Sequence, residues 1–474
     1  MLSHALELII DAKSKITETH ENLQKDFIFP IAHEKSIPES EIQSVAHEHV
    51  CPHKTAVDGD KDDRNSPFPM LNVSDALNII MSNVNRLSEP EEIRSPLNLP
   101  PFRASIKDGY AVKSSSTAKR RVVLGYVSAG EKIELNDFNT DSCFKINTGA
   151  AVPKFADAIV QIEDTKLLKT DANGMEQEIE IIKNPTPNQD IREVGSDLAD
   201  GELMFKTNGL MGIPELTMLA SVGLTVNQKM PRIAVISTGD ELVDPARRTL
   251  DKSQIYDSNS TMLKLLLQKY GFDVKCSAIA KDDYESLKAI VVKAMKECDI
   301  IISSGGVSMG DKDFVKPLMK ELGLKIHFGR VNMKPGKPMT FASNGDVFFF
   351  ALPGNPVSAF VTFHLFVLPP LRFMCGFPIA KCKLPTIDIC LQLEQYTLDT
   401  RPEYVRAQVT YVAGEGLFYA SMPVNQMSSR LASLTNADVL LHLPGATDKM
   451  KEITRGSKLK ATVINHHFIS EYRD

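Results

Sequence analysis

Between residues 232 and 373 the apolar positions form two patterns, short continuous runs and helical periodicity, and their succession predicts an α/β domain. Short runs rich in Ile, Val and Phe are typical of buried strands, and they occur at 232–237, 273–279, 299–304, 325–331 and 347–352. Helical periodicity separates these runs, at 257–271, 284–297, from about 313, and at 357–373. Strands that alternate with helices predict right-handed crossovers and a parallel sheet in a three-layer α/β fold.

The other folded segments have different patterns. Residues 104–185 contain short alternating runs separated by Gly, Asn and Pro, which predict a β-rich subdomain. Before this subdomain, Ser74 is suited to cap a helix that continues to Val84. After it, residues 197–222 have a mixed, partly helical pattern. Beyond Lys383, short strand-like runs predict a small closed β-barrel or a sandwich.

The first part of the chain is of another kind. Residues 2–23 have helical periodicity, and residues 25–66 have the polar, charged composition of a flexible linker. The linker contains the run HEHVCPH at 47–53, whose spacing could bind a soft metal. No second ligand pair follows at zinc-finger spacing, so a solvated polar run is the favoured interpretation.

Composition narrows the class of protein. The chain has 474 residues, enough for about three domains, and its net charge of −6 argues against a general nucleic-acid binder. Its 7 cysteines include no CxxC pair, which favours reduced thiols and the cytosol. Charged residues interrupt the first apolar run, so it is not a secretory signal. Prolines interrupt the most apolar stretch, 347–371, which favours a buried helix over a membrane span.

Unusual loops follow the predicted strands of the α/β domain. They are Ser237–Glu241, Ser303–Gly310 with Asp311 and Asp313, Met333–Pro338, and Leu352–Pro356. Because ligands bind at the carboxyl ends of parallel strands, we expect these loops to form one site.

The loops differ in chemistry in a complementary way. Glycines such as Gly305 and Gly306 allow backbone N–H groups to approach an anion, and a helix begins after them. Lys334 and Lys337 supply cations. Carboxylates are hard ligands suited to Mg²⁺, and the candidates are Asp240, Glu241, Asp257 and Asp313. The prolines stiffen the last loop. Together they predict a site for an anionic, phosphate-bearing ligand.

Each loop alone is more often an ordinary turn. The glycine loop is not a Walker A motif, because Asp311 stands where Lys is required, and it also lacks GxGxxG. The expectation of a site therefore depends on the convergence of these loops. Outside the domain, Asp108 before a glycine and Thr148 in a glycine turn are also candidates, although composition alone favours ordinary turns.

Nine motifs together resemble a known family. They are PPFRASIKDGYAV, INTGAAVPKFADAIVQIED, STGDEL, YDSNS, SSGGVSMGDKD, MKPGKP, LPGNPVSA, RPEYVR and NQMSSRL, in that order between about Ser66 and Ile464. The chain resembles the MoeA-type molybdopterin molybdotransferases, and within them the E domain of gephyrin-type proteins. Residues 1–24 resemble the last helix of a gephyrin-type G domain.

The resemblance implies a domain plan. We expect a remnant helix at 1–24, a linker at 25–66, a MoeA N-terminal and linker region at 67–230, a molybdopterin-binding α/β domain at 231–376 and a C-terminal β domain at 383–466. The rest of a G domain is absent from this sequence, so the adenylylation that it performs is expected to be missing.

The resemblance also implies a reaction, namely transfer of molybdenum from molybdate to adenylylated molybdopterin with Mg²⁺ and release of AMP. The expected catalytic residues are Asp313, Glu241, Asp257 and Asp108, with Asp313 and Glu241 also holding the metal. The expected ligands of adenylylated molybdopterin are Thr148, Ser237, Gly239, Asp240, Asp282, Ser304, Gly305, Gly306, Ser308, Pro353, Gly354 and Pro356. The expected molybdate pocket is Lys334, Lys337, Pro338, Arg406 and Ser429.

Partners follow from the same resemblance. A homodimer is expected, with Asp108 and Thr148 reaching the site of the partner subunit. The alternative function is a gephyrin-type scaffold that binds inhibitory receptor loops and the cytoskeleton, and so associates with membranes through partners. Its peptide groove would include Leu77, Tyr404 and Pro444. Leu77 stands where a phenylalanine anchor is expected and Ser74 where an aspartate is expected, which weakens that alternative.

Overall fold

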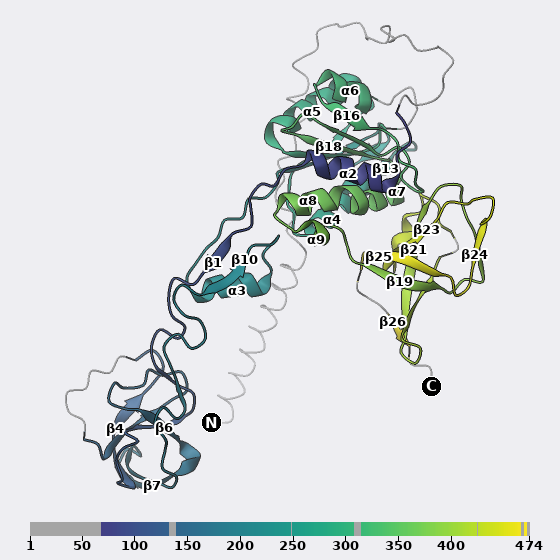
Figure 1. Ribbon diagram of the computed structural model, residues 1–474. Helices are drawn as coiled ribbons and strands as arrows, with labels where there is room; N and C mark the ends of the chain where they lie inside the picture. The colour runs from purple at the N-terminus through teal and green to yellow at the C-terminus, as the bar shows by residue number, and fades with distance from the viewer. Residues whose placement is uncertain are drawn as a thin grey trace, which may run out of the picture. The chain divides into compact units, whose positions relative to one another are not determined.

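A computed structural model describes residues 68–131, 139–247, 249–307, 314–423 and 425–465, and the backbone of 469–471. The chain forms two compact units (Figure 1). One contains the described residues up to Ser88 together with Gln228 onward, and the other is Glu89–Asn227. We describe each unit by itself.

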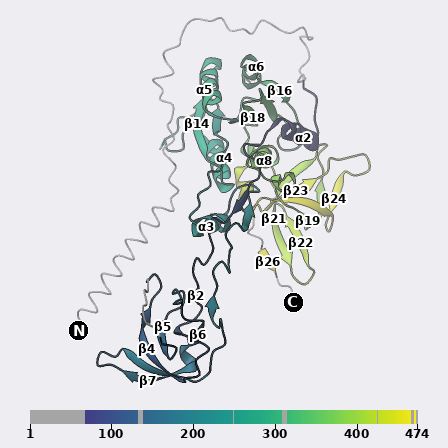
Figure 2. The same ribbon diagram turned by 60° about the vertical axis from the view of Figure 1, so that its left-hand side comes forward.

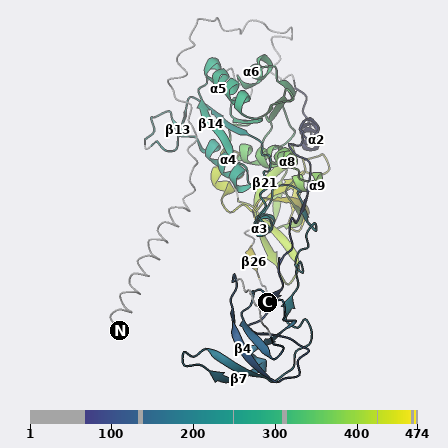
Figure 3. The same ribbon diagram turned by 90° about the vertical axis from the view of Figure 1, so that its left-hand side faces the viewer.

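The larger unit contains the predicted α/β sheet. Its strand order is β14-β11-β15-β18-β17-β16, and β14, β11, β15 and β18 run parallel. These four strands are β11 (Ile233–Thr238), β14 (Val274–Ala280), β15 (Ile300–Ser304) and β18 (Phe348–Leu352). Two short strands, β12 (Leu242–Val243) and β13 (Ile255–Tyr256), pair beside them. Figure 3 shows β14 at one edge of the sheet.

The sheet is mixed rather than wholly parallel. Strand β17 (Thr340–Ser343) runs antiparallel to β18 and to β16 (Lys325–Phe328). The Oδ1 atom of Asn344 accepts the N–H groups of Asp346 and Val347, and so closes a tight turn between β17 and β18. Such a short connection cannot form a parallel crossover. The expectation of a parallel sheet missed β17 because its apolar run is short.

Helices cover both faces of this sheet (Figure 1). On one face α5 (Tyr284–Glu297) and α6 (Val315–Glu321) bury Ile290 and Leu318 against strand residues such as Phe349. On the other face lie α4 (Ser258–Lys269) and a continuous helix made of α7 (Pro356–Thr362), η3 (Phe363–Val367) and α8 (Leu368–Met374). A short helix, α9 (Ile379–Cys382), follows.

The helix Pro356–Met374 is long and apolar enough to cross a membrane by length and composition, but 78% of its apolar window is buried in the fold. Helix α2 (Val73–Asn83) packs against it. The N-cap of α2 is Asn72 rather than Ser74, which lies exposed in the first turn. The prediction of Ser74 as cap was wrong by two positions, since the backbone becomes helical from Val73.

The C-terminal strands close a barrel, as predicted (Figure 2). Around it run β22 (Leu417–Ser421), β19 (Thr386–Leu391), β25 (Lys458–Val463), β23 (Val439–Leu443) and β21 (Glu403–Val412). A further pairing of β21 with β22 completes the closure. Val405, Val439 and Leu441 fill its core. The accessory elements are β20 (Gln395–Thr397), β24 (Glu452–Thr454), β26 (Ile469–Glu471) and η4 (Leu431–Leu434).

The second unit is β-rich, as predicted. Its main sheet has the order β6-β3-β5-β4-β8-β7, and its strands are β3 (Gly109–Val112), β4 (Arg120–Val127), β5 (Ser142–Ile146), β6 (Ala158–Gln161), β7 (Thr165–Thr170) and β8 (Glu176–Ile181). The remaining elements are β1 (Glu92–Arg94), β2 (Ala104–Ser105), η2 (Ile162–Asp164), β9 (Ile191–Arg192), β10 (Leu203–Lys206) and α3 (Ile213–Ser221).

Candidate functional site

The carboxyl ends of β11, β14, β15 and β18 are joined by short polar contacts. The Oγ atoms of Ser237 and Ser304, both buried, lie 3.2 Å apart and share a hydrogen bond. The N–H of Asp282 donates to Asp240 Oδ1 at 3.0 Å, and the N–H of Asp240 lies 3.5 Å from Asp282 Oδ2. The structure therefore brings these four predicted residues to one edge of the sheet.

Gly305 allows the glycine loop to approach its neighbours closely. A Cβ atom at Gly305 would lie 2.6 Å from Thr238 Oγ1, and the φ angle there is +92°. Gly354 in the next loop would place a Cβ atom 3.5 Å from the Cα atom of Gly305. The N–H of Gly305 donates to the carbonyl of Leu352 at 3.1 Å. This N–H is thus already used, and the glycine serves close packing instead.

Asp257 begins α4 and has an unusual carboxylate. Its Oδ1 atom accepts the N–H of Ser260 at 3.0 Å, as an N-cap does. The side chain is buried, and its Oδ2 atom has no hydrogen-bond partner among the described residues. In the same turn Asn259 donates to the carbonyl of Gly354 at 2.7 Å. Asp257 therefore retains one buried acceptor for a donor or a cation.

Glu241 lies in the loop after β11. Its side chain is exposed, and its carboxylate lies over Gly239, since a Cβ atom there would be 2.7 Å from Glu241 Oε2. Among the described residues, no group of three His, Cys, Asp or Glu side chains is arranged to hold a metal ion.

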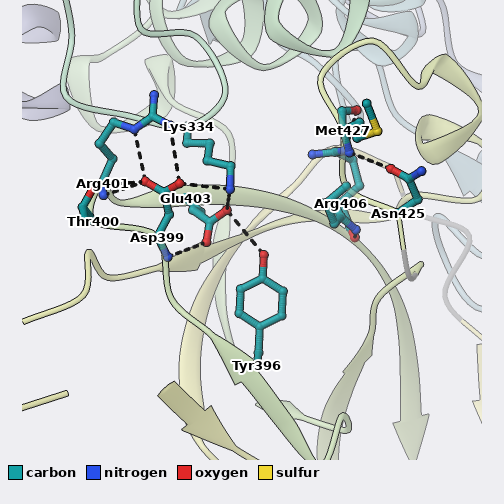
Figure 4. Close-up of polar contacts among 10 residues, drawn as sticks. Lys334, Tyr396, Asp399, Thr400, Arg401, Glu403, Arg406, Asn425 and Met427 are labelled. Atoms are coloured by element: carbon teal, nitrogen blue, oxygen red, sulfur yellow. Dashed lines mark hydrogen bonds and ion pairs between the residues drawn. The ribbon is translucent and has the colours of Figure 1, made fainter. Parts of the chain in front are cut away.

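Lys334 is held by two carboxylates (Figure 4). Its Nζ atom lies 3.1 Å from Asp399 Oδ2 and 3.0 Å from Glu403 Oε1. Burial lowers the pKa of Lys334, but the hydrogen bonds to Glu403 and Asp399 outweigh it, so the pKa lies above its usual value. The backbone of Lys334 also pairs with the start of β21: its N–H donates to Pro402, just before the strand, and its carbonyl accepts from Tyr404. The positive charge of Lys334 is therefore largely compensated.

Arg406 in β21 is a buried cation with neutral partners. Its Nε atom donates to Ser433 Oγ at 3.1 Å. One terminal nitrogen lies 3.4 Å from the carbonyl oxygen of Met427, to which it donates; Figure 4 labels both residues. Burial lowers the pKa of Arg406 to about 10, so it stays charged at neutral pH. None of its hydrogen bonds within the described part of the chain goes to a carboxylate, although the nearby charge of Glu403 also acts on Arg406. The guanidinium of Arg406 is therefore less directly compensated than the ammonium group of Lys334.

The loop Pro353–Pro356 contacts both groups of residues. On one side Gly354 lies against Gly305, and on the other Asn355 Nδ2 donates to Ser428 Oγ at 3.0 Å. Ser428 also accepts the N–H of Val357 with its carbonyl, at 3.1 Å. This serine stands between Met427, the partner of Arg406, and the predicted ligand Ser429.

The remaining predicted ligands differ in exposure. Lys337 and Ser429 are exposed, and Pro338 is half-buried beside the buried Met339. Pro353 is buried, and Pro356 opens α7. Gly306 also approaches its neighbours closely, since a Cβ atom there would lie 2.9 Å from a methyl group of Val315.

Asp108 and Thr148 meet in the second unit. Asp108 Oδ1 accepts the N–H of Thr148 at 2.8 Å and its hydroxyl at 3.2 Å. Both residues are exposed. The predicted residues Asp313 and Ser308, and the linker run at 47–53, lie outside the described residues.

Of the three residues of the expected peptide groove, Leu77 is buried, and Tyr404 and Pro444 are half-buried. Leu77 has an exposed fraction of 6% in α2, which leaves little side chain for an incoming peptide. Tyr404 packs edge-on against His442, with ring centroids 5.0 Å apart, and Pro444 is half-buried after β23.

Sequence reasoning missed the residues that compensate Lys334. Asp399 lies in the loop before β21, and Glu403 is the first residue of that strand. The Nε atom of Arg401 lies 3.1 Å from Asp399 Oδ1. The motif RPEYVR, which supplies the predicted residues Tyr404 and Arg406, also contains Arg401 and Glu403 and was the available signal. Asn355, in the motif LPGNPVSA, was also missed.

Three family models match the chain in succession. The MoeA N-terminal region (domain I and II) matches residues 72–223, a probable molybdopterin binding domain matches 234–372, and the MoeA C-terminal region (domain IV) matches 393–456. A solved MoeA protein of Pyrococcus horikoshii, 27% identical, superposes with a TM-score of 0.64, covering 84% of this chain and 100% of that one.

Curated relatives agree. The molybdenum cofactor synthesis protein cinnamon of Drosophila melanogaster is 44% identical, over 100% of this chain and 75% of its own length. Gephyrin of Dictyostelium discoideum is 37% identical, over 85% of this chain and 63% of its own length. The molybdopterin molybdenumtransferase of Haemophilus influenzae is 34% identical, over 65% of this chain and 74% of its own length. The chain therefore belongs to the MoeA/gephyrin family of molybdenum cofactor synthesis proteins.

Proposed function

We propose that this protein is a molybdopterin molybdotransferase, which transfers molybdenum from molybdate to adenylylated molybdopterin and releases AMP. Family membership supports a transferase of molybdenum cofactor synthesis. The observation that carries the finer assignment is the loop Pro353–Pro356, which contacts the glycine loop at Gly305 and the barrel loop at Ser428. The regions that would bind the two anionic substrates thus lie next to each other, as a reaction between a diphosphate-linked pterin and an oxyanion requires. Receptor scaffolding gains no support from the comparisons.

The strand-end loops would bind the diphosphate of adenylylated molybdopterin, with Ser237, Ser304 and Gly306 nearest the sheet. Molybdate would bind beside Arg406, where a buried guanidinium offers N–H donors in a water-poor setting that strengthens their hold on an oxyanion. Exposed Lys337 and Ser429 would complete that pocket. Lys334 would orient the pocket more than charge it, since two carboxylates already hold its ammonium group.

The residues present fit Mg²⁺. Asp257 has a buried oxygen without a partner in the described part of the chain, and Glu241 is exposed in the neighbouring loop. Mg²⁺ that accompanies phosphates is usually held by one or two carboxylates and the substrate itself. Asp257, Glu241 and Asp313 would hold the ion, which when bound neutralises charge on the diphosphate.

The test is release of AMP from adenylylated molybdopterin in the presence of molybdate and Mg²⁺. Purified wild-type protein is expected to release AMP and to form molybdenum-bearing cofactor, and the Asp313→Ala variant is expected to do neither. No release by the wild type, or equal release by the variant, would refute the proposal. Omission of Mg²⁺ tests the metal separately.

We further infer a cytosolic homodimer in which Asp108 and Thr148 act on the partner's site. In support, Asp108 and Thr148 form a preorganised, exposed pair, and no two cysteines of the described residues are joined by a disulfide. Mixing inactive Asp108→Ala and Asp313→Ala proteins should restore activity, because mixed dimers contain one intact site. A mixture that stays inactive, although mass spectrometry shows that mixed dimers formed, would refute shared sites.

A further inference from the structure

Asn355 lies where the loop Pro353–Pro356 contacts the barrel, and the reaction as proposed gives this side chain no role. It follows Gly354, whose carbonyl accepts a hydrogen bond from Asn259 at 2.7 Å and whose Cα atom faces Gly305. On this side, the loop Pro353–Pro356 contacts the loops at the carboxyl ends of the strands. Movement of Gly354 would therefore press on the glycine loop, which has no spare room beside Thr238.

The amide of Asn355 points to the barrel. Its Nδ2 atom donates to Ser428 Oγ at 3.0 Å, and the next backbone N–H, that of Val357, donates to the Ser428 carbonyl at 3.1 Å. Ser428 directly follows Met427, whose carbonyl accepts from Arg406. Asn425 Oδ1 accepts the N–H of Met427 at 3.0 Å, which fixes the start of the same loop.

A continuous series of contacts thus joins the glycine loop to the buried guanidinium. It runs from Gly305 through the loop Pro353–Pro356 to Ser428, and then through Met427 to Arg406. We propose that Asn355 is a positioning residue that couples occupation of the strand-end loops by a nucleotide to the affinity of the Arg406 pocket for an oxyanion. The identity of the two ligands rests on the proposed function.

The physical basis is ordering. The loop around Ser428 is part-exposed, and a ligand that fixes one end of the series reduces the conformational freedom that a second ligand must still remove. The two ligands should then bind with positive coupling, and by linkage each must raise the affinity of the other by the same factor. Without the amide of Asn355, the hydrogen bond from the Val357 N–H would be the one left to Ser428 among the described residues of the two loops.

The experiment is calorimetric titration of the full chain with sodium molybdate, without and with saturating AMP. In the wild type we expect AMP to lower the Kd of molybdate about two- to tenfold, the range that one hydrogen bond provides. In Asn355→Ala this ratio should fall to about one. Ser428→Ala should behave alike, and the double variant should add nothing, because both changes remove one interaction. Titration with AMP at saturating molybdate must give the same ratios.

The matched control is Asn344→Ala, the same change at the opposite end of β18, where the side chain closes only its own turn. It should lower thermal stability but leave the ratio unchanged. In turnover, Asn355→Ala should raise the KM of molybdate more than it lowers kcat, whereas simple destabilisation would lower the active fraction alone.

A ratio of one in the wild type, or the wild-type ratio retained in Asn355→Ala, would overturn the proposal. Both outcomes come from binding alone. They are therefore distinguishable from failure of the proposed function, which would appear as absence of AMP release by the wild type.

Discussion

Glu403 is 3% exposed, yet its Oε1 atom lies 3.0 Å from the ammonium nitrogen of Lys334. The pair joins the first residue of a barrel strand to a loop of the α/β sheet. Tyr396 approaches the same carboxylate at 3.4 Å, and the N–H of Asp399 approaches its other oxygen at 3.3 Å. A buried carboxylate with this many partners holds the loop of Lys334 against the barrel.

Glu403→Gln should therefore lower the free energy of unfolding by about 1–3 kcal/mol, since hydrogen bonds to a charged group are lost. Glu394→Gln is the matched control, because Glu394 pairs with Arg455 on the surface, with 79% of its side chain exposed. That change should cost no more than about 0.5 kcal/mol. Urea unfolding measures both, and equal effects would contradict the role assigned to Glu403.

Gly305→Ala should be more damaging than its φ angle alone explains. Gly345 has a similar φ angle, +97°, but a Cβ atom there would meet nothing within 4 Å. Gly345→Ala should cost about 1–3 kcal/mol from backbone strain. Gly305→Ala adds a clash with Thr238, so its cost should be clearly larger, or the variant should not fold. If urea unfolding gives the same loss for both, the glycine loop is less tightly packed than described.

Asp257 separates a structural role from a functional one. Asp257→Asn keeps Oδ1 as cap of α4 and replaces the unpartnered Oδ2 by a donor. Stability should change little, whereas AMP release should fall by at least tenfold. Asp283→Ala removes the cap of α5 and should cost about 1 kcal/mol without loss of activity. Activity that survives in Asp257→Asn would assign this carboxylate to the cap alone.

Two buried histidines predict how stability depends on pH. Burial lowers the pKa of His364 to about 4, and burial lowers that of His442 to about 4 as well. In the unfolded chain both titrate near 6.5, so between about pH 4 and 6.5 the unfolded state binds more protons. Stability from these groups is present above pH 6.5 and is lost as the pH falls toward 4.

The measurement is the urea midpoint between pH 4 and 7. His442→Gln, which can still bond to Thr462, should reduce the slope with pH over this window. An unchanged slope would contradict the prediction, because it would mean that His442 can be protonated in the folded protein without loss of stability.

Much of the fold was predictable because it is periodic. The parallel strands and their helices have the right lengths and apolar content, and the strand-end loops follow from the topology of a parallel sheet. Strand β17 was not predictable, since four residues after Pro338 carry no period of their own and gain their partners from β16 and β18.

The candidate site was less predictable than the fold. The sequence indicated Lys334 as a cation, but its compensation by Asp399 and Glu403 depends on a strand far along the chain. The link from Asn355 to Ser428 is likewise non-local. In contrast, Asp257 was recognisable as the residue before α4, because capping is a local property.

The antiparallel pairing of β17 and β18 restricts how the turn between these two strands can change in evolution. Ser343 pairs with Phe348 and Thr340 with Ala351, so the length of the turn at Asn344 determines the alignment of β18 in the sheet. A one-residue slip would reverse the two faces of that strand. Insertions and deletions at this surface turn should therefore be as poorly tolerated as changes in the loop Pro353–Pro356, and chimaeras that exchange loops with relatives must preserve the turn length.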